Sequence, residues 1–125
     1  EEALIVARGE QAYVVMNLYP YNAGQLLVCA YRHVADLTEL SDDERNEIFE
    51  LSAHAMKTLR KVSAPAGFNL GMNQGAISGA GVAEHIHQHI VPRWSGDANF
   101  MPLIGQTKVL PVLLAQTRAE LAQAW

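Results

Sequence analysis

The sequence predicts an α+β protein with a five-stranded antiparallel sheet, one long helix and a C-terminal helix. Five short apolar, β-prone stretches are separated by turn-forming Gly, Pro and Asn residues. One strongly patterned helical segment separates the third stretch from the fourth, and another helical segment ends the chain. Short connections on either side of a single long helix favour an antiparallel sheet over alternating β-α-β units.

Three strands are expected in the N-terminal quarter of the chain. Residues 4–7 and 13–18 are apolar runs separated by Arg8-Gly9-Glu10, which suits a hairpin. Residues 19–24 form a turn, because the proline in this stretch fixes φ and its glycine permits a positive φ. Residues 25–31 follow as a third strand that is apolar enough to be buried.

The long helix begins with a capping box in which Ser41 is the N-cap and Glu44 stands three residues further on. Acidic residues lie in its first turn and basic residues near its end, as the helix dipole favours. Pro65 and Gly67 are expected to end it. The apolar residues at helical spacing are Ile48, Phe49, Leu51, Ala55, Met56, Leu59 and Val62.

Two strands and a helix complete the predicted fold. Residues 68–73 are a fourth strand, and residues 74–84 are a glycine-rich loop. Residues 85–92 are a fifth strand, which the proline at its end is expected to terminate. Residues 109–124 form the last helix, with Pro111 tolerated in its first turn.

Composition limits the functions that the chain can have. Its net charge is −4 and it has only nine Lys and Arg, so non-specific nucleic-acid binding is not expected. Cys29 is the only cysteine, which excludes an internal disulfide and suits a reducing, cytoplasmic location. No apolar run approaches the roughly 18 residues of a membrane span, and no signal peptide is visible.

No repeat or linker divides residues 1–125, so we expect a single domain. The sequence opens on Glu1 and not on Met, so we expect the full protein to have an N-terminal segment that this sequence lacks.

Three of the five histidines alternate along the predicted fifth strand. Because strand side chains alternate between faces, His85, His87 and His89 should project to one side of the sheet, and Ile86 and Gln88 to the other. Three imidazoles are a poor choice for a core, since each buried ring nitrogen needs a partner. The plain alternative is a solvent-facing polar strand.

Two chemical interpretations of these histidines compete. A His-x-His pair with a third histidine can hold zinc with one open position. Alternatively, a neutral imidazole can attack phosphorus and form a covalent intermediate, while its neighbours fix its tautomer and move protons. The glycine-rich loop before the strand favours the second interpretation, because small residues let backbone N–H groups approach phosphate oxygens. No cysteine or second histidine pair nearby completes a metal shell.

These residues resemble the histidine-triad (HIT) family, whose signature is His-φ-His-φ-His-φ-φ with φ apolar. The chain reads His-Ile-His-Gln-His-Ile-Val over residues 85–91 and departs only at Gln88, which should point away from the triad. The similarity spans about residues 13–114. One flanking motif resembles the family's Asn-x-Gly before the loop, Asn73-Gln74-Gly75. Two others resemble a bacterial branch with diadenosine tetraphosphate phosphorylase or hydrolase activity, namely Pro92-Arg93-Trp94 and Gly96-Asp97-Ala98-Asn99-Phe100.

The resemblance implies a HIT-like fold, a homodimer and a role for each histidine. His87 attacks the α-phosphate and forms a nucleotidyl-histidine, His89 contacts a phosphate oxygen, and His85 holds the network's geometry. Asn73 contacts phosphate. The glycine-loop residues that the resemblance places at the substrate are Gly79, Ala80 and Gly81.

The resemblance also implies a nucleoside site at the end of the second strand. Asn17 binds the ribose hydroxyls, and Leu18 lines the base pocket. The chain has Ala23-Gly24-Gln25 where many members have Pro-Gly-His, so Gln25 replaces a fourth active-site histidine and is expected to bind substrate. The loop also lacks the Ser or Thr that often precedes the triad, which leaves the protonation of the leaving group and the acceptor undetermined.

The leading hypothesis is hydrolysis of a dinucleoside polyphosphate at the α-phosphate. Its alternatives are phosphorolysis, with inorganic phosphate as the acceptor, a phosphoramidase, and a nucleotide- or metal-binding module without turnover. No cofactor is required by this chemistry, although Mg²⁺ can accompany the polyphosphate. No nucleic-acid or membrane partner is expected.

Three other polar residues have plainer interpretations. His33, at the end of a predicted strand, is expected to have a surface or capping role. His54 lies between apolar positions of the long helix and is expected to be structural. Arg93 either reaches phosphate or pairs with an acidic neighbour such as Asp97.

Overall fold

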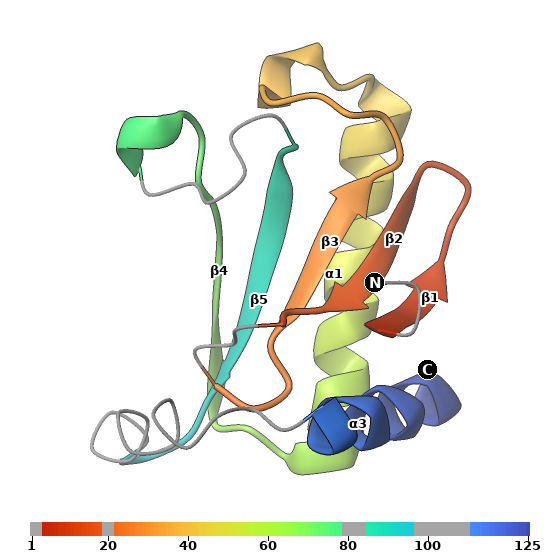
Figure 1. Cartoon of the computed structure of the whole chain (residues 1–125), viewed down its shortest axis with the longest axis vertical. Coiled ribbons are helices and arrows are strands. Elements are labelled where there is room, and N and C mark those ends of the chain that lie inside the picture. The colour runs from red at the N-terminus through yellow and green to blue at the C-terminus, as the bar shows by residue number, and fades with distance from the viewer. Residues whose placement is uncertain (1–3, 19–21, 79–84, 97–110) are drawn as a thin grey trace.

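A computed structural model describes residues 4–18, 22–78, 85–96 and 111–125 (Figure 1). The α+β class and the predicted order of strands and helices are confirmed. None of the helices in this part of the chain is long and apolar enough to cross a membrane. The elements are β1 (Ile5–Arg8), β2 (Ala12–Met16), β3 (Leu26–Ala30), η2 (Leu37–Glu39), α1 (Asp42–Ser63), β4 (Gly67–Met72), η3 (Ala76–Ser78), β5 (His87–Arg93) and α3 (Pro111–Ala124).

The strands form one five-stranded sheet in the order β1-β2-β3-β5-β4, and all neighbouring strands are antiparallel. The last strand in the sequence, β5, therefore lies between β3 and β4, while β4 forms an edge of the sheet (Figure 1). This order places the histidine strand inside the sheet, where strands on both sides fix its backbone.

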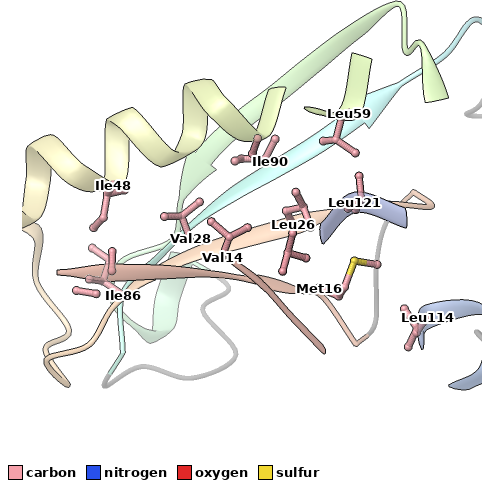
Figure 2. Packing of buried hydrophobic residues seen from close by; sticks show 14 of the residues in the cluster. Val14, Met16, Leu26, Val28, Ile48, Leu59, Ile86, Ile90, Leu114 and Leu121 are labelled. Carbon is pink, nitrogen blue, oxygen red and sulfur yellow. The ribbon is translucent and has the colours of Figure 1, made fainter. Parts of the chain in front are cut away.

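The hydrophobic core lies between the sheet and its two long helices. In Figure 1, α1 runs along the far face of the sheet and α3 crosses near the β1 end. Figure 2 shows Ile48 and Leu59 of α1 beside Val28 and Ile90 of the sheet, all of which are buried. The opposite face of the sheet, here called the open face, carries no helix in the described part of the chain (Figure 1).

Helix α1 begins as predicted and ends just before Pro65 as predicted, but Gly67 takes no part in its end. The Ser41 side chain accepts from the Glu44 backbone N–H, and the Glu44 side chain accepts from the Ser41 backbone N–H, which completes the capping box. The helix ends at Ser63, and the left-handed cap is Ala64 (φ 48°), whereas Gly67 begins β4. Pro65 cannot continue the helix, so the chain turns at the residue before it. Phe49, one of the apolar residues at helical spacing, is 75% exposed.

The prediction that Pro92 terminates the histidine strand is wrong. β5 begins at His87, later than expected, and continues through Pro92 to Arg93. Pro92 pairs with Phe68 of β4, but the ladder between β3 and β5 stops at Ile90, so no partner on that side requires the missing N–H. The Pro92 carbonyl instead accepts a hydrogen bond of 2.6 Å from the Asn22 side-chain amide.

Candidate active site

The alternation predicted for the histidine strand is confirmed. Burial alternates along β5: Gln88 and Ile90 are buried on the helix face, whereas His87 and His89 are half-buried on the open face. The His87 and His89 rings meet edge to face, with 4.8 Å between their centroids. The departure from the apolar pattern at Gln88 therefore lies on the face away from the triad.

The middle histidine is held in one tautomer by the backbone. His87 Nδ1 lies 3.0 Å from the backbone oxygen of His85. Because a carbonyl oxygen only accepts, Nδ1 must carry the proton of the neutral ring, and the lone pair is then on Nε2. A nucleophilic imidazole needs such a lone pair, and in His87 it lies on Nε2, the nitrogen that is not hydrogen-bonded to the His85 backbone.

The first histidine anchors the start of the strand. His85 Nε2 donates to the backbone oxygen of Ala30, at 2.8 Å, and so joins the end of β3 to the start of β5. The ring of His33 lies 4.8 Å from the His85 ring, centroid to centroid. His33 is exposed, as predicted, but the sequence did not indicate this contact with the triad because 52 residues separate the two rings along the chain.

The last histidine is bonded to the residue that replaces the family's fourth histidine. Gln25 Nε2 lies 2.9 Å from His89 Nδ1, and the Gln25 side chain is completely buried. Burial of the His89 ring, and secondarily its proximity to His87, lowers the pKa of His89 below the usual 6.5. The lowered pKa of His89 favours the neutral form of its ring.

The sheet register supplies neighbours that the sequence did not indicate. Cys29 of β3 is paired with His87, and Leu27 of β3 is paired with His89. On the other side, Gly71 of β4 is paired with His89. Paired residues face the same side of a sheet, so these small and apolar side chains flank the histidines on the open face. Val15 of β2 is paired with Leu27 and therefore faces the same side, so Val15 and Leu27 together form an apolar surface beside His89.

No group of three or more His, Cys, Asp or Glu side chains among the described residues is arranged to hold a metal ion. His85 and His87 each have a ring nitrogen bonded to a backbone oxygen, which leaves fewer nitrogens that could converge on one metal. The arrangement is suited to attack on an electrophile beside Nε2 of His87.

Comparison with known proteins decides the family. The HIT domain family matches residues 1–96. The chain belongs to the HIT domain family. The predicted resemblance is thereby confirmed.

Curated relatives within the HIT family include nucleotide-processing enzymes. The chain is 50% identical over 125 residues to "AP-4-A phosphorylase" of Mycobacterium tuberculosis, a match that covers all of this chain and 64% of that protein. It is 32% identical over 82 residues to the asymmetrical bis(5'-nucleosyl)-tetraphosphatase of Schizosaccharomyces pombe, which covers 66% of this chain and 44% of the relative. The chain thus spans less than two thirds of the length of either protein.

Solved HIT structures share the fold. The NitFhit protein of Caenorhabditis elegans superposes with a TM-score of 0.84 at 24% identity, covering 98% of this chain and 27% of that one. A hypothetical histidine triad nucleotide-binding protein of Sulfolobus tokodaii superposes with a TM-score of 0.83 at 21% identity, covering 97% and 82% of the two chains. At these identities the likeness supports the fold alone, and it confirms the predicted HIT-like architecture.

Some of the residues predicted to bind substrate lie near the triad, and others lie outside the described residues. Asn17 directly follows β2, and its backbone N–H donates to the Gln25 oxygen at 3.1 Å. Leu18 beside it is 49% exposed. Asn73 is exposed and directly follows Met72, which is paired with Gln88, so Asn73 lies at the end of β4 nearest His87. The loop residues Gly79, Ala80 and Gly81 lie outside the described residues.

The other polar residues have partners away from the triad rings. Arg93 donates to the Asn69 side-chain oxygen at 2.6 Å, while its predicted partner Asp97 lies outside the described residues. His54 stacks on Trp125 and bonds to the backbone oxygen of that residue at 2.6 Å, consistent with a structural role.

Proposed function

We propose that this HIT domain cleaves a dinucleoside polyphosphate at the α-phosphate through a covalent nucleotidyl intermediate on Nε2 of His87. The observation that carries the proposal is the 3.0 Å hydrogen bond between His87 Nδ1 and the His85 backbone oxygen, which leaves the Nε2 lone pair available. The names of the HIT relatives, a phosphorylase and a tetraphosphatase of dinucleoside polyphosphates, support the same substrate class.

The first step exchanges one bond for another. His87 Nε2 attacks the α-phosphorus, the bond from that phosphorus to the bridging oxygen breaks, and the rest of the polyphosphate leaves with the bonding electrons. The ring becomes positively charged on nucleotidylation, and the His85 carbonyl dipole, which accepts from Nδ1–H, stabilises that charge. In the second step an acceptor oxygen attacks phosphorus, and Nε2 leaves with its lone pair restored.

The acceptor decides between the two leading candidates. Water as the acceptor gives a nucleoside monophosphate, whereas inorganic phosphate gives a nucleoside diphosphate. We keep phosphorolysis as a second candidate because a relative that matches the whole chain at 50% identity carries the name of a phosphorylase. The second candidate therefore has a specific observation in its favour.

The nucleoside fits the open face beside His89. Val15 and Leu27 form the apolar surface there, which suits the face of a base. Asn17, at the end of β2, is positioned to bond the ribose hydroxyls, and Leu18 can cover the base from the rim. Asn73, at the opposite side of His87, is positioned to contact phosphate.

The test is turnover of diadenosine tetraphosphate by the wild type and by His87→Asn, with products identified by mass spectrometry with and without phosphate. We expect His87→Asn to lower kcat/KM by about a thousand-fold or more. His54→Asn is the matched control, because His54 lies on α1 with Trp125 as its partner, and it should retain activity. Unchanged turnover in His87→Asn would refute the assignment.

Product identity separates the candidate functions. ADP and ATP formed only with phosphate identify a phosphorylase, and AMP and ATP formed without phosphate identify a hydrolase. Cleavage of a nucleoside phosphoramidate, with the polyphosphate left intact, would identify a phosphoramidase. Tight nucleotide binding without any turnover would refute an enzymatic role.

We further propose that the domain forms a homodimer through the β4 edge. Two hollows of about 400 and 380 Å³ are lined by residues of α1 and β4, and Phe49 lines both. Their apolar lining includes Leu37, Met56, Leu70 and Met72. Phe49 and Leu70 are 75% and 46% exposed. The edge strand β4 could pair with β4 of a second copy, because an antiparallel edge can pair with itself about a two-fold axis.

Sedimentation velocity tests the dimer. We expect a wild-type dimer and a Phe49→Glu monomer, because two buried carboxylates in an apolar interface are unfavourable. Lys57→Gln, an exposed change on the same helix, is the control and should remain dimeric. A monomeric wild type, or a dimeric Phe49→Glu, would contradict this interface.

A further inference from the structure

Gln25 is the most confined polar side chain at the site. Its backbone N–H donates to the Asn22 oxygen at 3.2 Å, and its backbone oxygen accepts from Asn17 N–H at 3.1 Å. Gly24, at φ 83°, makes the turn that directs the chain into β3. With both backbone groups bonded and the side chain fully buried, Gln25 has little freedom to reorient towards a substrate.

The Gln25 amide defines which nitrogen of His89 carries the proton. Gln25 Nε2 is only a donor, so His89 Nδ1, at 2.9 Å, must accept. A neutral ring that accepts at Nδ1 carries its proton on Nε2. His89 then offers an N–H at its outer nitrogen, the reverse of His87, whose outer nitrogen offers a lone pair.

The other neighbours of His89 do not compete with Gln25 in setting its tautomer. On the flanking strands, the residues paired with His89 are Leu27 and Gly71, and neither can titrate. Among the described residues, the titratable ring of His87 lies 4.8 Å away between centroids. Gln25 cannot take up a proton itself, so its amide does not change protonation state as the pH changes.

We infer that Gln25 is a positioning residue that holds His89 as the Nε2–H tautomer, so that His89 donates to a non-bridging phosphate oxygen while His87 attacks. The inference rests on the proposed function for its catalytic consequence. It differs from the expectation that Gln25 binds substrate, since the amide acts through His89. A glutamate at this position, which accepts instead of donating, would reverse the tautomer and favour the charged ring.

Nitrogen NMR of ¹⁵N-histidine-labelled resting protein tests the hydrogen bond without any substrate. The His89 signals are assigned by their loss in His89→Asn. We expect an unprotonated Nδ1 and a protonated Nε2 in the wild type, and a protonated Nδ1 in Gln25→Glu. A wild-type ring protonated at Nδ1 alone would overturn the inference, and so would a tautomer that Gln25→Glu leaves unchanged.

Single-turnover formation of the nucleotidyl-enzyme tests the catalytic consequence. We expect Gln25→Leu to slow this step by about ten-fold or more, and Gln25→Glu to add a pH dependence that the wild type lacks over the same range. Gln88→Leu is the matched control, because Gln88 is also buried but faces the helices, and it should keep the wild-type rate and tautomer.

These outcomes separate the inference from the proposed function. Inactive wild-type protein with the expected His89 tautomer would refute the proposed function and leave the hydrogen bond established. Active wild type with an unchanged rate in Gln25→Leu would refute the positioning role alone. Because the wild-type spectrum needs no variant at position 25, the tautomer is tested even if a Gln25 variant fails to fold.

Discussion

Glu44 connects the start of α1 to the segment that follows β3, and its loss should be measurable as stability. Its carboxylate accepts from the Ser41 backbone N–H at 2.7 Å and from Arg32 Nε and Nη2 at 2.8 and 2.9 Å. The Glu44 side chain is 4% exposed, whereas that of Arg32 is 54% exposed. We expect Glu44→Gln to weaken both Arg32 bonds, because the neutral amide is a poorer partner for a guanidinium.

The magnitude follows from the pKa of Glu44. The hydrogen bonds from Arg32, followed by that from the Ser41 backbone, lower this pKa from 4.5 to about 2. Such a shift corresponds to a ceiling of about 3 kcal/mol in the free energy of unfolding. Because solvent screens the half-exposed guanidinium, we expect about 1–2 kcal/mol at neutral pH.

The direction of the pH dependence is fixed by the sign of the shift. A carboxyl group whose pKa is lower in the folded state contributes its stability above pH 4.5, and this contribution is lost as the pH falls towards 2. Urea unfolding at several pH values measures it. The wild type should exceed Glu44→Gln by about 1–2 kcal/mol at pH 7, and the difference should nearly vanish near pH 2.

The control is Glu50→Gln, an exposed change on the same helix, which should differ little from the wild type at any pH. Equal stability of Glu44→Gln and the wild type at pH 7 would refute the assignment of this carboxylate as an anchor. A difference that persists undiminished at pH 2 would refute its electrostatic origin.

Other changes test the remaining contacts of α1 by urea unfolding. Ser41→Ala removes the side-chain cap of the helix and should cost about 1 kcal/mol; an unchanged midpoint would show that the cap is dispensable. Glu47→Gln weakens the acceptor for the Gln11 and Ala12 N–H groups, at 2.7 and 2.9 Å, and should cost about 1 kcal/mol, unlike Glu50→Gln. Leu59→Ala opens a cavity at a side chain that is 1% exposed and should cost about 2–5 kcal/mol; a loss below 1 kcal/mol would contradict its place in the core.

The local patterns in the sequence predicted much of the fold because the interactions behind them are local. The capping box at Ser41 and the spacing of Ile48, Ala55 and Leu59 needed only neighbouring residues to specify α1. Alternation likewise placed His87 and His89 on one face, since the side chains of any strand alternate. The boundary error at Pro92 arose because strand pairing decides it: Pro92 pairs with Phe68 of β4, and the ladder with β3 has already stopped at Ile90.

The contacts that define the site could not be predicted in this way. Strand order and register bring Leu27 and Gly71 to either side of His89, and no short pattern encodes which strands become neighbours. The exposure of Phe49 shows the same limit, because helical spacing identifies an apolar position without saying which surface it faces. Burial of Gln25 was also hidden, since glutamine is most often exposed.

The division of labour between His87 and His89 follows from what each Nδ1 contacts and not from the rings themselves. A backbone carbonyl can only accept, so it requires His87 to carry its proton on the inner nitrogen and leaves a nucleophile outside. An amide N–H can only donate, so it requires His89 to accept on the inner nitrogen and leaves a donor outside. The first partner is the backbone oxygen of His85, two residues before His87 and just ahead of β5. The second comes from a residue 64 positions earlier, brought to His89 by the pairing of β3 with β5. A histidine in place of Gln25 could either donate or accept and could also titrate, whereas the glutamine amide adds no titrating group beside His89 Nδ1.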